Sequence, residues 1–501
     1  MIAIDKLTPE QLERFLHMQS IVDRQENDAR KVVAFRKYYD GEHPILLTDR
    51  QREYIGDLLD TENFTFAHNV VKTIVDTLRE RLEVEGFTVN GESADEEEGN
   101  KDGLLAGQLW DWWIANRLDS EQIRAYRKAL RDGKSYVMVS YDNDEQRPDV
   151  GVHSVWDGKS GVTFHRDPGN PKTVLFANRY FYTFDPLNPG KTGTLRKTTY
   201  LPHEIRKYVQ DGKSPNGWAT TMDEGDPVWP LPWVTDDGKP LGVALVEFAN
   251  PGGSEIEQIL GLQNGLNKSW LDLIAAADTS GFAILAFEYN EAGPAVGSDD
   301  NLEGSDEFRV GPGRALEVDG GRVHRIEGAD LTHLIDTIWA LTAAIAGVSR
   351  TPQYHLKPLG ASDVPSGEAL KMLESGLVKR AEERQLIFGQ AWEDVMALAY
   401  RVGQKFGNVP DSSGKFNVGV QWADANVRNE AVEIGVAEGM KRLEVPDEIV
   451  WQRAGLTPEQ IAKAKQTARD ERIADVAAMA GAIQLQATRN QPQTNPQQGN
   501  N

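Results

Sequence analysis

Hydrophobic positions in the first part of the chain recur at helical spacing. Thr8-Pro9-Glu10-Gln11 combines a capping hydroxyl, a first-turn proline and a glutamine that can reach back, so a helix is predicted to begin there and to run toward Gly41. A second helix is predicted from Asn69, and others over 104–116 and 120–131. The run 135–141 alternates like a strand. The face predicted for the second helix consists of Val71, Ile74, Val75, Leu78 and Leu82.

The pattern changes after about residue 142. Up to about residue 248, short alternating runs are separated by Pro, Gly and Asn, which is typical of an irregular β-rich layer. The stretch 227–233, PVWPLPW, has too many prolines for a central strand. One further strand is predicted far along the chain, at 416–422. Together these patterns predict an α+β protein with several domains.

Two helices bracket a small insert. Ser254-x-x-Glu257 reads as a capping box for a first helix ending near Gly281, and Asp330 reads as the cap of a second, ending near Val348. Short β-like runs lie between them, at 283–287, 308–310, 316–318 and 323–326. The apolar stripes of the two helices comprise Ile256, Ile259, Leu260, Leu266 and Trp270, and Leu334, Ile335, Ile338 and Leu341.

A loop with three prolines, 349–366, excludes a continuous helix and contains the basic residues Arg350, His355 and Lys357. A long amphipathic helix is predicted from Glu368 to about Val402. The chain after about 426 is mostly helical in pattern, and 484–501 has too few apolar residues to fold. The stripe of the long helix includes Leu370, Leu373, Leu377, Phe388 and Trp392.

The amino-acid composition argues against several classes of function. Lys and Arg total 54 against 77 Asp and Glu, a formal charge of -23, which argues against a free-standing sequence-specific DNA binder. An acidic surface would instead let a duplex slide past without sticking. The absence of cysteine and of an export signal suggests a cytosolic origin. No membrane span is expected, since the best apolar run, 335–348, is short and carries Asp336.

The motifs of common enzymes fail at identifiable positions. Each of the four Gly-Lys-[Ser/Thr] tripeptides lacks the glycine that a phosphate-binding loop needs five residues earlier. No histidine spacing matches a zinc site, so no metal, cofactor or catalytic residue is predicted. A pair of carboxylates like that of a glycosidase stays open, because its separation is three-dimensional. Trp110, Trp112 and Trp113 could form a sugar platform, but packing is the more common role for such residues.

The order of these elements resembles the portal, or head-to-tail connector, family of tailed bacteriophages. No single motif is specific to this family. The specific feature is the order of the elements: a helix, an insert, a helix, a loop and a long helix. The segments that carry the resemblance are Tyr38-Tyr39-Asp40-Gly41 with Asn69-Val70-Val71, Ala129-Leu130-Arg131-Asp132-Gly133-Lys134-Ser135-Tyr136, Phe248-Ala249-Asn250-Pro251, Gly347-Val348-Ser349-Arg350-Thr351-Pro352 and Ser366-Gly367-Glu368-Ala369-Leu370-Lys371.

The resemblance implies a non-enzymatic, ring-forming subunit, with a dodecamer expected, at one capsid vertex of the virion. Double-stranded DNA would pass through the ring, which would contact the terminase motor, head-completion or adaptor proteins and the major capsid protein, after assembly in the bacterial cytoplasm. The implied parts are a wing (1–250, with a returning strand near 416–425), stem helices (251–281 and 330–348), a small α/β clip (282–329), a tunnel loop (349–366), a long tunnel helix and connection (367–415), a helical crown (426–483) and a disordered tail (484–501).

A simple estimate agrees with this resemblance. About twelve stem helices spaced about 10 Å apart would lie on a circle roughly 38 Å across and leave about 28 Å for a duplex. Arg350, His355 and Lys357 are then expected to meet phosphates without reading bases, or to pair with acidic residues of the next subunit. The stripes on the stem and tunnel helices would be completed by a neighbouring subunit. Rival interpretations are another head protein, such as a minor capsid protein, and a carbohydrate-active enzyme.

Overall fold

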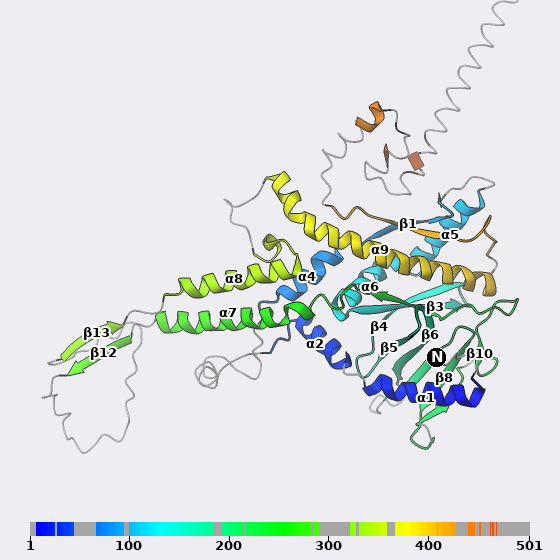
Figure 1. Ribbon diagram of the computed structural model, residues 1–501, viewed down its shortest axis with the longest axis horizontal. Coiled ribbons are helices and arrows are strands. Elements are labelled where there is room, and N and C mark those ends of the chain that lie inside the picture. The colour runs from blue at the N-terminus through cyan, green and yellow to red at the C-terminus, as the bar shows by residue number, and fades with distance from the viewer. Residues whose placement is uncertain are drawn as a thin grey trace, which may run out of the picture. The chain divides into compact units, whose positions relative to one another are not determined.

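The computed structural model is a mixed α+β protein (Figure 1). It describes residues 7–25, 28–44, 67–94, 100–184, 193–214, 217–223, 225–281, 284–289, 321–326, 330–357, 366–407 and 409–426, with short pieces between 439 and 467. The chain divides into two compact units. Unit 1 contains 1–82, 121–138 and 151–388, and unit 2 contains 83–120, 139–150 and 389–501. The unit boundaries cut through the region predicted as the wing.

The predicted helix starts near the N-terminus of unit 1 are confirmed. Helix α1 (Pro9–Gln25) opens with the predicted reciprocal cap: Gln11 N donates to Thr8 Oγ1 at 3.3 Å, and Thr8 N donates to Gln11 Oε1 at 3.0 Å. Two helices are present where one was predicted: α2 (Asp28–Asp40) follows α1 and ends before Gly41, whose φ is +88°. Helix α4 (Val70–Arg79) begins after Asn69, which accepts from the backbone of Lys72.

The β-rich layer of unit 1 is a six-stranded antiparallel sheet, in the order β10-β8-β7-β6-β5, with β9 paired to β8. The proline-rich β10 lies at its edge, as predicted for a strand that cannot donate freely. Leu12 and Leu16 of α1 pack on Phe176 and Leu201 of this layer. The strands are β5 (Gly161–Asp167), β6 (Asn170–Thr183), β7 (Thr194–Tyr200), β8 (Glu204–Gln210), β9 (Trp218–Thr220) and β10 (Leu231–Pro232).

Four elements contribute residues to both units: α6 (Leu118–Asp132), β3 (Lys134–Asp142), β4 (Arg147–Ser154) and α9 (Gly367–Phe406). Strand β3 is the run predicted at 135–141, and it lies between β11 (Leu245–Ala249) and β4 in a three-stranded sheet. The helices predicted over 120–131 and from 368 to about 402 are confirmed as α6 and α9.

Two long helices of unit 1, α7 (Leu260–Gly281) and α8 (Thr332–Ser349), lie side by side in Figure 1. Between them in sequence, β12 (Ile284–Tyr289) pairs antiparallel with β13 (Gly321–Ile326). The predicted helix-insert-helix order is therefore present. The cap predicted at Asp330 is wrong by one residue, because the N-cap position of α8 is Leu331; Asp330 lies just before it and accepts from Thr332 N at 2.9 Å. The strands predicted at 308–310 and 316–318 lie outside the described residues.

The capping box predicted at Ser254 is wrong. Ser254 Oγ accepts from Ile256 N at 3.1 Å and donates to Arg131 O at 2.5 Å, so the hydroxyl forms a tertiary contact. Glu257 does not reach back, because it pairs with Lys31 at 3.1 Å. A 3-10 turn, η2 (Glu257–Ile259), therefore precedes α7, and the α-helix begins at Leu260.

Helix α8 is the one helix in the described part of the chain that is long and apolar enough, by length and composition alone, to cross a membrane. Such evidence is weak, because a helix that packs on another in a water-soluble protein passes the same test. Here one side of α8 packs on α7, where the side chain of Leu341 approaches Gly265.

Unit 2 is built around a three-stranded sheet of order β14-β1-β2. Strand β14 (Val418–Trp422) is the returning strand predicted near 416–425, and it pairs antiparallel with β1 (Val84–Val89), which in turn pairs with β2 (Glu92–Ser93). Helix α5 (Lys101–Ala115) packs on β1. Its Trp113 is fully buried, with ring centroids 5.4 Å from Phe87 and 4.7 Å from Trp392.

Candidate functional site

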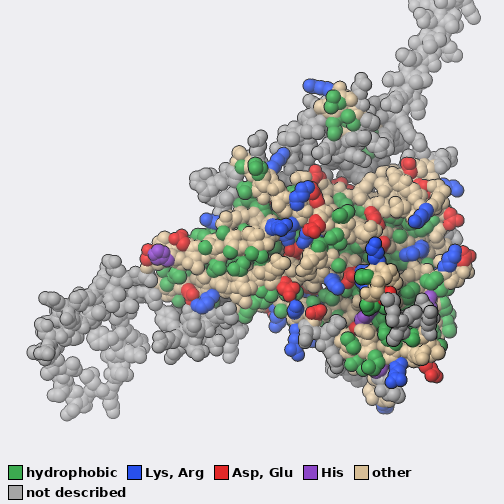
Figure 2. All heavy atoms as spheres, in the orientation of Figure 1, with side chains coloured by type: hydrophobic (Ala, Val, Ile, Leu, Met, Phe, Trp, Pro, Cys, Tyr) green, Lys and Arg blue, Asp and Glu red, His purple; other side chains and the backbone are tan. Residues whose placement is uncertain are grey.

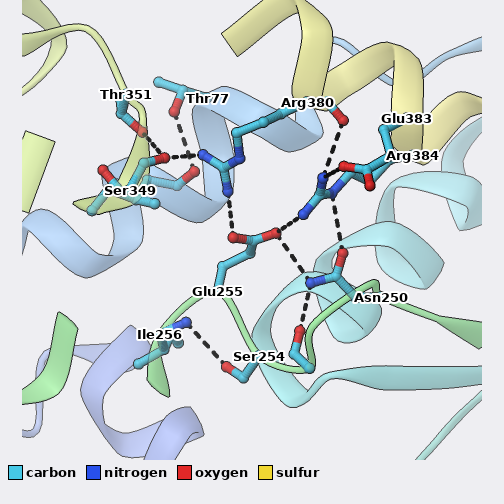
Figure 3. A network of polar contacts seen from close by, with 12 residues as sticks. Thr77, Asn250, Ser254, Glu255, Ile256, Ser349, Thr351, Arg380, Glu383 and Arg384 are labelled. Atoms are coloured by element: carbon cyan, nitrogen blue, oxygen red, sulfur yellow. Dashed lines mark hydrogen bonds and ion pairs between the residues drawn. The ribbon is translucent and has the colours of Figure 1, made fainter. Parts of the chain in front are cut away.

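The loop before η2 and helix α9 are joined in unit 1 by one carboxylate (Figure 3). Glu255 accepts from Arg384 Nη2 at 2.8 Å and from Arg380 Nη2. Asn250 also donates to Glu255, at 3.1 Å. All three charged side chains are about nine-tenths shielded from solvent. Two guanidinium groups therefore share one carboxylate in a nearly dry environment, where the interaction is strong and loss of one partner is costly.

The same network reaches the end of α8. Arg380 Nη1 donates to the carbonyl oxygen of Ser349, the last residue of the helix, and Thr351 Oγ1 donates to this oxygen at 3.5 Å. The next residue, Arg350, is left-handed, with φ +49°, and its side chain is exposed. A cation beside a free carbonyl at the C-terminus of a helix is favourable because the helix dipole is negative there. Arg380 thus adds a tertiary hydrogen bond at the point where α8 ends.

His355 is held inside its own chain. Its Nε2 lies 2.9 Å from Glu374 on α9, which also pairs with Arg81. Burial lowers the pKa of His355, and the nearby charge of Arg81 lowers it further. Burial raises the pKa of Glu374, and Arg81 opposes this rise. A neutral His355 that donates to Glu374 fits this geometry, so this residue adds no positive charge for a phosphate at neutral pH.

The other two predicted cations differ in their surroundings. Lys357 Nζ lies 4.4 Å from the centre of the Trp339 ring, a cation-π contact. The backbone N–H of Arg350 donates to Gly347 O at 3.3 Å, and its side chain forms no hydrogen bond or ion pair within the described residues. The expectation that they meet DNA or a neighbouring subunit stays a prediction.

The apolar stripes predicted on the stem and tunnel helices are mostly covered within one chain. A neighbouring subunit cannot cover a side chain that its own chain already buries, so the expectation is corrected for the fully or nearly fully buried residues, and it stays a prediction for the half-buried ones. The fully or nearly fully buried residues are Ile256, Ile259, Leu266, Ile338, Leu377, Phe388 and Trp392, and the half-buried ones are Leu260, Trp270, Leu334, Leu341 and Leu370.

Two predicted residues do lie on the surface: Ile335 is 40% exposed and Leu373 is 53% exposed. The structure adds exposed apolar side chains that were not predicted, among them Val348, Met372 and Leu386. Figure 2 shows hydrophobic side chains gathered over the surface of α7 and α8. These exposed side chains are the ones that remain available for a partner.

The tryptophans offered as a sugar platform do not form one. Trp112 and Trp113 are buried, and Trp110 stacks on Trp113 with ring centroids 6.0 Å apart. Trp233 is also buried and donates to Gly242 O at 2.8 Å. Within the part of the chain that the structure describes, no three His, Asp or Glu side chains converge as metal ligands would.

The Glu255 network was not predicted from the sequence, although a signal exists. Arg380 and Arg384 are four residues apart on the same face as Leu377 and Phe388, so both arginines sit within the apolar stripe of a long helix. Charged residues in such a position require a buried partner. The partner, Glu255, was hidden because its segment was read as a capping box.

Comparison with known proteins agrees with the element order. The chain matches the family model described as Phage portal protein, SPP1 Gp6-like, over residues 19–474. It is 27% identical over 380 residues to the portal protein of Mycobacterium phage D29, which covers 72% of this chain and 70% of that protein. It is 26% identical over 415 residues to the portal protein of Mycobacterium phage L5, covering 78% and 75%. The chain therefore belongs to the SPP1 Gp6-like family of phage portal proteins.

Proposed function

We propose that the chain assembles with copies of itself into a closed ring at one capsid vertex, through which double-stranded DNA is packaged and ejected. The observation that carries this proposal is the family match, which spans 19–474 and includes the α7 and α8 pair with its small strand insert. The ring acts by passage and docking and catalyses no reaction. A dodecamer is the expected size, because about twelve helices leave room for a duplex.

The parts of the ring follow from this proposal. Helices α7 and α8 form the stem, and β12 and β13 belong to the clip, which docks the terminase motor and head-completion proteins. The segment after Ser349 forms the tunnel loop, and α9 is the tunnel helix. The wing, around the six-stranded sheet, faces the major capsid protein. The proposed crown (426–483) and tail (484–501) lie largely or wholly outside the described residues.

Subunit contacts are proposed at the apolar side chains that one chain leaves exposed on α8 and α9. Leu373, Met372 and Leu386 lie on α9, and Ile335 and Val348 lie on α8. Burying these side chains against a neighbour would add favourable hydrophobic free energy at about 25 cal/mol per Å² of apolar surface. In the proposed tunnel loop, Arg350 and Lys357 provide the positive charge for phosphates.

The mass of the purified protein in solution tests this proposal. Native mass spectrometry and negative-stain images should show closed rings of about a dozen copies. A monomer, or an open-ended lattice, would favour a minor capsid protein instead. The carbohydrate-active alternative has lost its main support, since Trp112 and Trp113 lie in the core of unit 2.

A further inference from the structure

Three nitrogen-bearing side chains of unit 1 lie close together, on α6, β4 and β6: Lys128, His153 and Arg179. Each is half-buried. Lys128 Nζ donates to the carbonyl oxygen of Val152, the neighbour of His153, at 3.4 Å. Burial lowers the pKa of His153 to about 3, and the positive charges of Arg179 and Lys128, which both act on His153, add to this shift. The three groups are therefore near neighbours.

The acceptors around this cluster are weak. Arg179 Nη1 has the sulfur of Met138 at 3.9 Å, and its guanidinium lies 4.7 Å from the centre of the Phe181 ring. Tyr200, whose pKa is raised by burial and held back by Arg179, also donates to Met138, at 3.2 Å. His153 Nε2 is buried without a hydrogen bond. In the described residues, no hydrogen bond or ion pair joins Lys128, His153 or Arg179 to a carboxylate.

The acidic residues nearest to Lys128 are already engaged. Glu121 pairs with Arg124 at 2.6 Å, and Asp132 pairs with Arg36 at 3.0 Å. Burial, with repulsion from Arg124 and Arg131 outweighing any help from these two acids, lowers the pKa of Lys128 to about 8. Buried cations in proteins are normally paired with a negative group. Within the described residues, this cluster therefore has more hydrogen-bond donors than good acceptors, and no carboxylate is bonded to it to balance its positive charge.

We propose that Lys128, His153, Arg179 and Tyr200 bind a small free oxyanion of the phosphate or sulfate class. Such an ion offers several acceptor oxygens to a guanidinium, an ammonium and two neutral donors, which is the combination that recognises tetrahedral oxyanions. Because Lys128 and Arg179 are half-buried and Tyr200 is buried, a small dissociable ion reaches these donors more readily than a phosphate fixed on a polymer. The bound ion would stabilise unit 1, and this role does not depend on ring assembly.

Isothermal titration of the full chain with inorganic phosphate, in chloride buffer of matched ionic strength, tests the site directly. Saturable binding of one ion per chain is expected, and Arg179→Met should weaken it by roughly tenfold or more, because a charge-assisted hydrogen bond is lost. The matched control is Lys159→Met, which removes an exposed lysine elsewhere in unit 1 and should leave binding unchanged. Sulfate in place of phosphate shows whether the site needs the tetrahedral shape alone.

Thermal unfolding of Lys128→Met gives a second test, because the difference in unfolding temperature between variant and wild type should change direction between chloride and phosphate. In chloride, the variant should unfold at the same or a higher temperature than the wild type, because repulsion among the cations is relieved. In about 5 mM phosphate, the wild type should gain stability that the variant does not gain. The absence of saturable phosphate and sulfate binding to the wild type, or equal binding by wild type and Arg179→Met, would overturn the proposal.

Discussion

Arg384 Nη2 lies 2.8 Å from Glu255 Oε1, although 129 residues separate the two in sequence. The carboxylate also binds Arg380, so a single side chain neutralises much of the charge on two buried guanidinium groups. This arrangement connects the segment before α7 to α9. Within this network, we expect the loss of Glu255 to lower the free energy of unfolding the most.

Glu255→Gln should lower the free energy of unfolding by about 3–5 kcal/mol, because it leaves two buried arginines without their shared partner. The matched control is Glu383→Gln, whose side chain pairs with Arg384 but is 54% exposed, and it should cost about 0–1 kcal/mol. Urea unfolding measures both. Equal losses for the two variants would contradict a special role for Glu255.

Arg350→Gly removes the positive charge of residue 350 while keeping its left-handed backbone conformation favourable. Glycine suits the left-handed conformation of residue 350 at the end of α8, so the unfolding free energy should stay within about 1 kcal/mol of the wild type or rise. If Arg350 meets phosphates in the tunnel, rings should still assemble but package or retain less DNA. The measurements are ring yield by negative stain and DNA content of particles. Normal DNA content would remove Arg350 from the proposed tunnel contacts.

Leu386→Ser tests the proposed contacts between subunits. Leu386 is 78% exposed in one chain, so the stability of the monomer should change by no more than about 0.5 kcal/mol. The yield of rings should fall, because apolar surface that a neighbour would cover has been removed. By contrast, Trp392→Ala should destabilise the chain itself by about 3–5 kcal/mol, since Trp392 is fully buried in unit 2. Size-exclusion chromatography and thermal unfolding distinguish the two effects.

Because of His43, the folded protein should lose stability as the pH is lowered. Asn267 Nδ2 lies 2.7 Å from His43 Nδ1, and Nε2 lies 2.7 Å from Tyr38 O, which fits a neutral ring that accepts at one nitrogen and donates at the other. Burial lowers the pKa of His43, while the Tyr38 carbonyl opposes this shift. The unfolded chain therefore takes up this proton first, and stability is lost as the pH falls below about 6.5.

The check is the unfolding temperature at pH 7 and pH 5, for the wild type and for His43→Gln. The drop between the two pH values should be smaller in the variant. The same substitution at His203, whose side chain is 40% exposed, is the control. A drop of the same size in the wild type and His43→Gln would show that His43 does not contribute.

Local chemistry made much of the fold predictable. Thr8 and Asn69 begin helices because their side chains cap nearby backbone groups, which is a property of adjacent residues. The same reasoning failed at Ser254, where a tertiary contact with Arg131 uses the hydroxyl. Local sequence cannot show that a distant carbonyl lies within reach.

Predictions about the site were limited for the same reason. An apolar stripe shows that one face of α9 is covered, but it does not show whether the cover comes from the same chain or from a neighbour. Phe388 is packed by Tyr126 and Phe248 of its own chain, whereas Leu373 is left exposed. His355 was expected to meet phosphates because its partner Glu374 becomes a neighbour only in the folded chain.

The hydrogen bond from Arg380 to Ser349 O limits how far α8 can move along its axis. Sliding this helix along its axis by one turn, about 5.4 Å, would take the carbonyl out of reach of the guanidinium. A displacement of α8 along its axis from the β12 and β13 end would therefore either move α9 with it or break this hydrogen bond. If the ring works as proposed, this hydrogen bond would couple movement of the stem helices to the tunnel helix.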